Sequence, residues 1–264
     1  MARISIPYAN RAPWRWALAG AGLGLLLALS LFAPASWLAA ALADGSGGRV
    51  TLADARGTVW SGSARLVLSG GSGSRDTATL SQRVEWRIRP AAYGLSAGVL
   101  ARCCMAQPWQ LQARLRWGGM QLAVSDANSQ WPAALLAGLG TPWNTLQPEG
   151  QLALSTQGVS ADWNAGRLTL NGRMQLDLEQ VSSRLSTLRP IGSYRVIVQG
   201  GPTATLRVET LEGSLHLSGN GQWVGSRLRF EGIASAEPDR VDALSNLLNI
   251  IGRRDGARAI IKVG

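Results

Sequence analysis

The only histidine of the chain, His216, is the first residue to consider for acid–base or metal chemistry. It lies between Leu215 and Leu217 and alternates with Ser214 and Ser218. In a strand, this alternation places the leucines on an apolar face and His216 on the polar face. A single histidine argues against a zinc protease and against a mechanism that uses histidine as its base. We therefore predict an exposed histidine, with a pH-sensitive role as the alternative.

Carboxylates that act together in catalysis must come close in the fold. The acidic residues of this chain are scattered and form no close pair in the sequence, as seen for Asp44, Asp54, Asp76, Glu85 and Asp126. Folding can still bring two together. A phosphate-binding loop is missing, because the run from Gly20 to Gly24 lies inside an apolar segment and precedes no strand–helix unit. The sequence therefore predicts no catalytic, cofactor-binding or metal-binding residue and no enzymatic activity.

The two cysteines, Cys103 and Cys104, are adjacent. Metal sites usually separate their cysteines by two to four residues, so this pair is a poor ligand set. Two interpretations stay open. An oxidising compartment favours a disulfide between neighbours, whereas the strain of such a ring favours two reduced or buried thiols.

The chain is strongly basic, with 26 lysine and arginine residues against 16 acidic ones and a net charge of +10. All the basic residues except Lys262 are arginine, and most alternate along strands rather than forming one run. This spread argues against nucleic acid as a partner. Anionic lipid headgroups or an acidic protein are the electrostatic targets that it favours.

An uncharged segment runs from Trp16 to Ala43 and follows Arg3, Arg11 and Arg15. Its first part is close to the about 20 apolar residues that a membrane-spanning helix needs. The arginines place residues 1–15 in the cytoplasm by the positive-inside rule. We predict an anchor and short linker over 16–43 and a periplasmic domain over 44–264. The alternative is a signal peptide cleaved after residue 43, although that site lies far from the apolar core.

The predicted anchor begins at Trp16 and its regular part ends at Phe32. Gly20, Gly24 and Ala28 recur every four residues, a spacing that lets a second helix approach closely. This face allows a partner helix or a homo-oligomer, although glycine and alanine are also common in membrane helices.

Alternating apolar and polar residues dominate the chain from Arg49 onward. Val84, Trp86 and Ile88, for example, alternate with arginine and glutamate. Such strands have one apolar face and one wet face, as in antiparallel sheets. Glycine-rich turns separate roughly thirteen such strands.

Few helices are predicted, at 131–139, at 182–188 and most clearly at 238–251, where Gly252 follows as a helix-ending residue.

The predicted fold is therefore mostly β. An N-terminal transmembrane helix precedes a large, antiparallel, strongly curled sheet, either an open roll or half-pipe or a sandwich, with a few short helices. A curled sheet would leave an apolar groove for a partner chain or a lipid tail. The last strand, 258–263, is a candidate edge strand.

A weak repeat places a glycine turn and an amphipathic strand after each of four tryptophans, Trp60, Trp117, Trp163 and Trp223. The irregular spacing argues against a propeller. We predict that these tryptophans are packing anchors at the ends of hairpin strands.

Several segments after the apolar run resemble the type II secretion system protein N family. They are Ala55–Gly62, Leu188–Arg195, Leu211–Trp223 and Leu247–Arg254. The resemblance covers nearly the whole chain. The matching positions that we take as family or structural residues are Gly57, Trp60, Gly62, Pro190, Gly192, Tyr194, Gly213, Trp223 and Gly252. The resemblance implies an inner-membrane accessory protein of the general secretion pathway, with no catalytic residue.

Two functions follow as hypotheses. The first is a non-enzymatic subunit whose periplasmic β-domain binds other inner-membrane secretion subunits or the outer-membrane pore. The second is an envelope lipid-handling protein with an apolar β-groove. An envelope hydrolase is a weaker third, since no catalytic constellation is visible.

Overall fold

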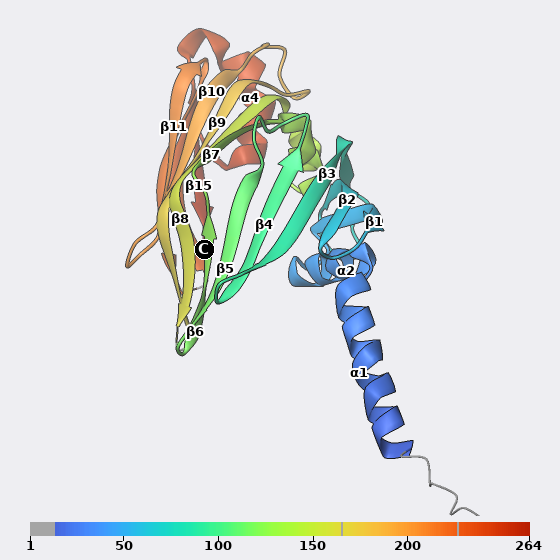
Figure 1. Ribbon diagram of the computed structural model, residues 1–264. Coiled ribbons are helices and arrows are strands. Elements are labelled where there is room, and N and C mark those ends of the chain that lie inside the picture. Colours follow the sequence, from blue (N-terminus) through green and yellow to red (C-terminus); the bar gives the residue numbers. More distant parts are fainter. Residues whose placement is uncertain (1–13, 165, 226) are drawn as a thin grey trace, which may run out of the picture.

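The computed structural model describes residues 14–164, 166–225 and 227–264. Two of the arginines used to predict the topology, Arg3 and Arg11, lie outside the described residues. The described chain begins with α1 (Trp14–Phe32) and α2 (Ala35–Gly45), and all of the later elements belong to or pack on one sheet. Figure 1 shows α1 leaving the sheet as a separate, extended helix.

Helix α1 is the one described helix that is long and apolar enough to cross a membrane. None of its residues is buried against the rest of the protein. It ends before Pro34, as the sequence predicted, because proline has no N–H to continue the helical hydrogen bonds. Helix α2 then turns against the sheet, where Ala35 is buried beside Ala64 and Trp86.

The mostly β prediction is confirmed by one antiparallel sheet of 15 strands. In chain order the strands are β1 (Val50–Gly57), β2 (Ser61–Ser69), β3 (Thr77–Ala91), β4 (Gly94–Ala101), β5 (Trp109–Arg116), β6 (Gly119–Val124), β7 (Ala127–Pro132), β8 (Glu149–Asn164), β9 (Arg167–Ser182), β10 (Gly192–Gln199), β11 (Thr205–Gly213), β12 (Leu215–Val224), β13 (Arg227–Ala236), β14 (Arg253–Asp255) and β15 (Arg258–Val263).

The strands follow one another in the sheet almost in chain order, from β1 at one edge to β15 and then β14 at the other. Among the described strands, β7 pairs with β8 alone and lies off this path. Because β1 and β14 do not pair with each other, the sheet is open rather than a closed barrel, and it is continuous rather than a sandwich of two sheets. In Figure 1, β8 to β11 lie on the left and β1 to β3 on the right, with β4 and β5 between them.

Strand register places apolar side chains on one continuous face, which we call the inner face. Leu206 and Val208 of β11 lie on the same face as Leu215 and Leu217 of β12, as predicted. His216 lies on the opposite, outer face and is exposed. The alternation in the sequence is therefore the alternation between the two faces.

Four short helices complete the fold: η1 (Ala133–Leu139), α3 (Trp143–Leu146), η2 (Pro238–Arg240) and α4 (Val241–Ile251). The predicted helix at 238–251 is confirmed as η2 followed by α4. Gly252 follows α4, as expected, but its backbone is extended (φ −165°) because the chain passes directly into β14.

Two of the predicted helical segments differ from the structure. Trp131 and Pro132 belong to β7, because they pair with Leu152 and Gln151 of β8, and the helix begins only at Ala133. The segment 182–188 contains no helix. There the hydroxyl of Ser183 accepts a hydrogen bond from the backbone N–H of Leu185, a local turn that competes with helix formation.

The buried residues form three clusters rather than one core. Helix α4 covers the inner face near β12, β13 and β15, with Leu244, Leu247 and Leu248 buried. Helix η1 covers the inner face of β3, with Leu135 buried. Helix α2 packs mainly on β1, with Ala35 also buried beside Ala64 of β2 and Trp86 of β3. The sheet between these clusters has no helix over its inner face among the described elements.

Candidate functional site

The uncovered part of the inner face carries large apolar side chains exposed to solvent. Leu122 of β6, Leu168 and Leu170 of β9, Met174 of β9 and Leu95 of β4 are all exposed. Register places them on the same side of the sheet as the buried leucines under α4. Contiguous apolar surface of this kind marks binding sites for protein or lipid.

The first group of family residues lies where α1 joins the sheet. Gly57, Trp60 and Gly62 form and flank the turn between β1 and β2. The Trp60 indole Nε1–H donates to the Ser30 carbonyl of α1 at 2.7 Å. A Cβ at Gly62 would lie 2.6 Å from Cζ2 of Trp86, so only glycine fits beneath that ring. These residues fix the start of the sheet to the end of α1.

The second group lies at the opposite end of the sheet, with Gly192 and Tyr194 buried and Pro190 and Gly213 exposed. Pro190, Gly192, Tyr194 and Gly213 come from the loop before β10, from β10 and from the end of β11, and register pairs Gly192 with Gly213. The peptide bond before Pro190 is cis. Tyr194 is buried in the cluster that contains Leu248. Gly192 and Gly213, distant in the sequence, thus meet in the sheet.

The remaining family residues, Trp223 and Gly252, join neither group. Trp223 ends β12 on the α1 side of the sheet and is half-buried. Gly252 lies where α4 meets the last strands, and a Cβ there would approach the Ile260 carbonyl to 2.5 Å.

The five predicted anchor residues, Trp16, Gly20, Gly24, Ala28 and Phe32, all lie on α1 and are exposed. A Cβ built at Gly20 or Gly24 would meet no atom within 4 Å. The small-residue face is therefore uncovered by the described part of the chain. Packing of a second helix against it stays a prediction.

The tryptophans of the repeat do not share one role. Trp60 and Trp223 are half-buried, but Trp117 and Trp163 are 103% and 52% exposed. The packing-anchor prediction is therefore wrong for Trp117 and Trp163. Both lie at hairpin ends where none of the described helices covers the inner face, and the β8–β9 hairpin continues beyond the last residues that pair with β10.

Removing the Tyr194 hydroxyl should leave stability unchanged or raise it by about 1 kcal/mol. The hydroxyl is buried without a hydrogen-bond partner among the described residues, and burial raises the pKa of Tyr194 above its ordinary value. Tyr194→Phe keeps the ring and removes the unsatisfied oxygen. Denaturant unfolding of both proteins measures the difference, with the exposed Tyr93→Phe as the matched control. A loss above 1 kcal/mol would show that the hydroxyl is bonded.

An ion pair between Arg195 and Asp177 joins β10 to β9 on the outer face. The guanidinium Nε and Nη2 donate to the two carboxylate oxygens, each at 2.7 Å, and Asp177 is largely shielded from solvent. The hydrogen bond from Arg195 holds the pKa of Asp177 below its ordinary value, against the opposing effect of desolvation. Paired geometry of this kind is the stronger form of a surface ion pair.

Asp177→Asn should cost about 1 kcal/mol at neutral pH. Because folding lowers the pKa of Asp177, the ion pair stabilises the folded protein fully at pH values above the pKa of the unfolded carboxyl, about 3.9. This stabilisation is lost as the pH falls through the pKa of the folded state. The difference in the free energy of unfolding between wild type and Asp177→Asn should therefore shrink below about pH 4. Glu231→Gln, which breaks the exposed pair with Lys262, is the control and should change little. A difference that does not depend on pH would contradict this assignment.

The histidine and the acidic residues form no recognisable reaction centre. His216 is exposed, as predicted, and its nearest carboxylate is that of Glu237 at 4.0 Å. Within the residues that the structure describes, no three histidine, cysteine, aspartate or glutamate side chains gather as a metal site would require.

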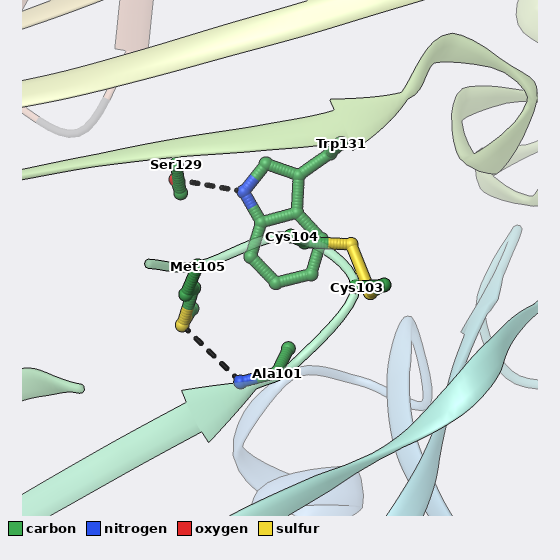
Figure 2. The surroundings of a disulfide bond; sticks show 6 residues. All are labelled: Ala101, Cys103, Cys104, Met105, Ser129 and Trp131. Carbon is green, nitrogen blue, oxygen red and sulfur yellow. Dashed lines mark hydrogen bonds between the residues drawn. A yellow bond between two sulfur atoms is a disulfide. The ribbon is translucent and has the colours of Figure 1, made fainter. Parts of the chain in front are cut away.

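Cys103 and Cys104 form a disulfide in the turn after β4. Figure 2 shows the pair beside Trp131, whose indole N–H donates to the Ser129 hydroxyl at 2.8 Å. Cys104 is buried, and its carbonyl accepts the backbone N–H of Gln130 at 2.7 Å. Of the two interpretations left open by the sequence, the structure has the disulfide, placed where the β4 turn meets β7.

These features define a class of protein: an open β-sheet joined to an apolar helix, with a broad apolar face suited to binding. The family model for type II secretion system (T2SS), protein N, matches residues 48–261. The chain therefore belongs to the type II secretion system protein N family, a component of the secretion machinery. No curated protein and no solved structure matches it.

Proposed function

We propose that the protein is a non-enzymatic, inner-membrane accessory component of the type II secretion system, and that its β-domain binds other secretion subunits. The family match over residues 48–261 carries this proposal. The exposed apolar part of the inner face supports it, because such a surface favours association. The partners proposed are other inner-membrane subunits or the outer-membrane pore.

The topology is part of the proposal. Residues 1–15 lie in the cytoplasm, 16–43 form the anchor and linker, and 44–264 form the periplasmic domain. The length and apolarity of α1 support this arrangement. A reporter that is active only after export should be active when fused after Gly264. N-terminal sequencing should find no new terminus at Asp44, since such a terminus would mean that the anchor is cleaved.

A free sheet edge offers a second mode of binding. Strand β14 pairs only with residues 258–260 of β15. At Ile261, Lys262 and Val263, the edge of β15 that points away from β13 therefore has no strand partner among the described residues. The prediction of an edge at 258–263 therefore holds for its second half. Strand addition there would satisfy the free backbone groups of both chains, while Lys262 deters indiscriminate pairing.

Deletion of the gene in its host, with complementation by the full chain, tests the function. We expect the deletion to lower export of substrates of the type II system while the same substrates still reach the periplasm. Normal export by the deletion strain would contradict the proposal. Export through the inner membrane serves as the control, because that step precedes type II secretion.

The lipid-handling hypothesis keeps one favouring observation, the exposed leucines of the inner face. In that case the face between the helices would hold acyl chains rather than a protein. Mass spectrometry of the purified full chain distinguishes the two, because a lipid carrier should retain phospholipid in stoichiometric amounts after gentle detergent exchange.

A further inference from the structure

The end of the sheet where α1 joins carries a set of turns between neighbouring strands. Because neighbouring strands are antiparallel, the turns β1–β2, β3–β4, β5–β6, β8–β9, β10–β11 and β12–β13 all fall at this end. Trp60, in the first of these turns, bonds to Ser30 of α1, and the N–H of Val59 donates to the Ala33 carbonyl at 2.8 Å. In Figure 1, α1 and the β5–β6 turn both point downward.

Exposed aromatic side chains are confined to the same end. Outside α1 and α2, the exposed aromatic residues in the described chain are Tyr93, Trp117 and Trp163. Each lies in or beside a turn on the α1 side. Trp37 of α2, which follows α1 directly, is exposed as well. An indole or phenol has an apolar body and a polar tip, and such side chains prefer the interface between a membrane and water.

Arginines accompany these aromatic residues. Arg116, Arg167 and Arg227 are the strand residues that border the turns β5–β6, β8–β9 and β12–β13, and all three are exposed. None of them belongs to an ion pair among the described residues, although Arg116 donates to the Gln121 amide oxygen. The sequence places no acidic residue in these turns. Basic groups without carboxylate partners complement anionic lipid headgroups.

Apolar side chains lie directly behind the turns. Leu115 and Met120 of the β5–β6 hairpin and Leu168 of β9 are exposed on the inner face. In a sheet that stands on its turns, these apolar side chains lie on the water side of the tryptophans and arginines, so the tips make the headgroup contact. A soluble protein partner would have to contact several separate turns at once, whereas a membrane is an extended surface that separate turns can contact together.

We call Tyr93, Trp117, Trp163, Arg116, Arg167 and Arg227 the turn rim, and we propose that it rests in the headgroup region of the membrane that α1 spans. The partner is an anionic phospholipid surface. The sheet then stands on the bilayer by its turns, with its uncovered inner face opening next to the lipid. This inference rests on the proposed placement of α1 in the membrane.

Depth-dependent fluorescence quenching in proteoliposomes tests the inference. The full chain carries one environment-sensitive dye at a time, on Trp117→Cys, Phe32→Cys or Leu211→Cys, since the native cysteines are joined in a disulfide. The vesicles contain phosphatidylethanolamine and phosphatidylglycerol, with a quencher attached to the lipid near the headgroup. Leu211 is an exposed apolar control towards the end of β11 that lies away from α1.

We expect the dye at residue 117 to lose as much fluorescence to the lipid quencher as the dye at residue 32, and the dye at residue 211 to lose little. Replacing phosphatidylglycerol by phosphatidylcholine should reduce the loss at residue 117 only. Equal, small losses at residues 117 and 211, with strong quenching at residue 32, would overturn the proposed membrane contact of the turn rim. The membrane placement of α1 would then still hold. Weak quenching at residue 32 would instead overturn the membrane placement of α1.

A photo-crosslinker at Trp117 in cells supplies the second readout. Adducts to phospholipid support the turn rim. Adducts only to a protein would assign this end of the sheet to a subunit interface and would overturn the inference.

Discussion

Replacing Leu248 by alanine should lower the free energy of unfolding by about 4 kcal/mol. Leu248 is fully buried where α4 packs on the inner face, beside Leu244 and Leu215. The change removes buried methyl groups and leaves a cavity that a sheet held by its neighbours cannot close. Denaturant unfolding of the full chain in detergent, followed by tryptophan fluorescence, measures the loss.

Ile250→Ala is the matched control for this prediction. Ile250 lies on the same helix but is 40% exposed, so its loss should stay below about 1 kcal/mol. A similar loss at both positions would mean that α4 is not packed against the sheet through Leu248. The contrast thus tests whether α4 closes one end of an otherwise uncovered face.

Gly213→Ala should cost about 3 kcal/mol, the second largest effect expected. Gly213 has φ +117°, a region that side chains rarely adopt. Its Cβ would also overlap the backbone of Gly192 and lie 2.5 Å from the Ile191 carbonyl. Both obstacles are backbone atoms, which cannot rotate away, so β10 and β11 would have to separate.

Gly256→Ala separates the two causes. Gly256 also has positive φ (+60°), but a Cβ there would meet no atom within 4 Å. Its loss should be about 1 kcal/mol, the cost of the left-handed backbone alone. If the two glycine variants unfold at the same denaturant concentration, the close approach of Gly192 and Gly213 does not contribute to stability.

The strands were predictable because their chemistry is local. In segments such as 84–88, the alternation of apolar and polar residues indicates which side chains lie on the inner face. The pairing of β3 with β2 and β4 confirms the same alternation in the neighbouring strands. The helix at 241–251 was predictable for the same reason, since its apolar residues recur on one face. The open sheet was one of the forms that the sequence allowed.

Exposure of Trp117 and Trp163 was not predictable in this way. A tryptophan before a glycine turn looks the same whether the hairpin end is covered or projects. The difference depends on strand lengths elsewhere: β8 and β9 have 16 residues each, whereas β10 has 8. A nearby arginine does not mark the difference, because Arg167 follows the exposed Trp163 at the same spacing of four residues as Arg227 follows the half-buried Trp223.

The pairing of Gly192 with Gly213 also depends on long-range register. The sequence identifies both glycines through the family resemblance, but not that they face each other beneath Tyr194. The bulge between Ser193 and Tyr194 sets that register, and no short motif encodes it.

Photo-crosslinking from the inner face in living cells tests most directly whether the β-domain binds a secretion subunit. The crosslinker replaces Leu170, which is 36% exposed on the inner face of β9, and the control replaces its neighbour Thr169 on the outer face. With the secretion genes expressed, we predict an adduct to another secretion subunit from Leu170 and none from Thr169. Adducts from Leu170 to phospholipid alone, or no adduct while the protein is folded, would contradict the account.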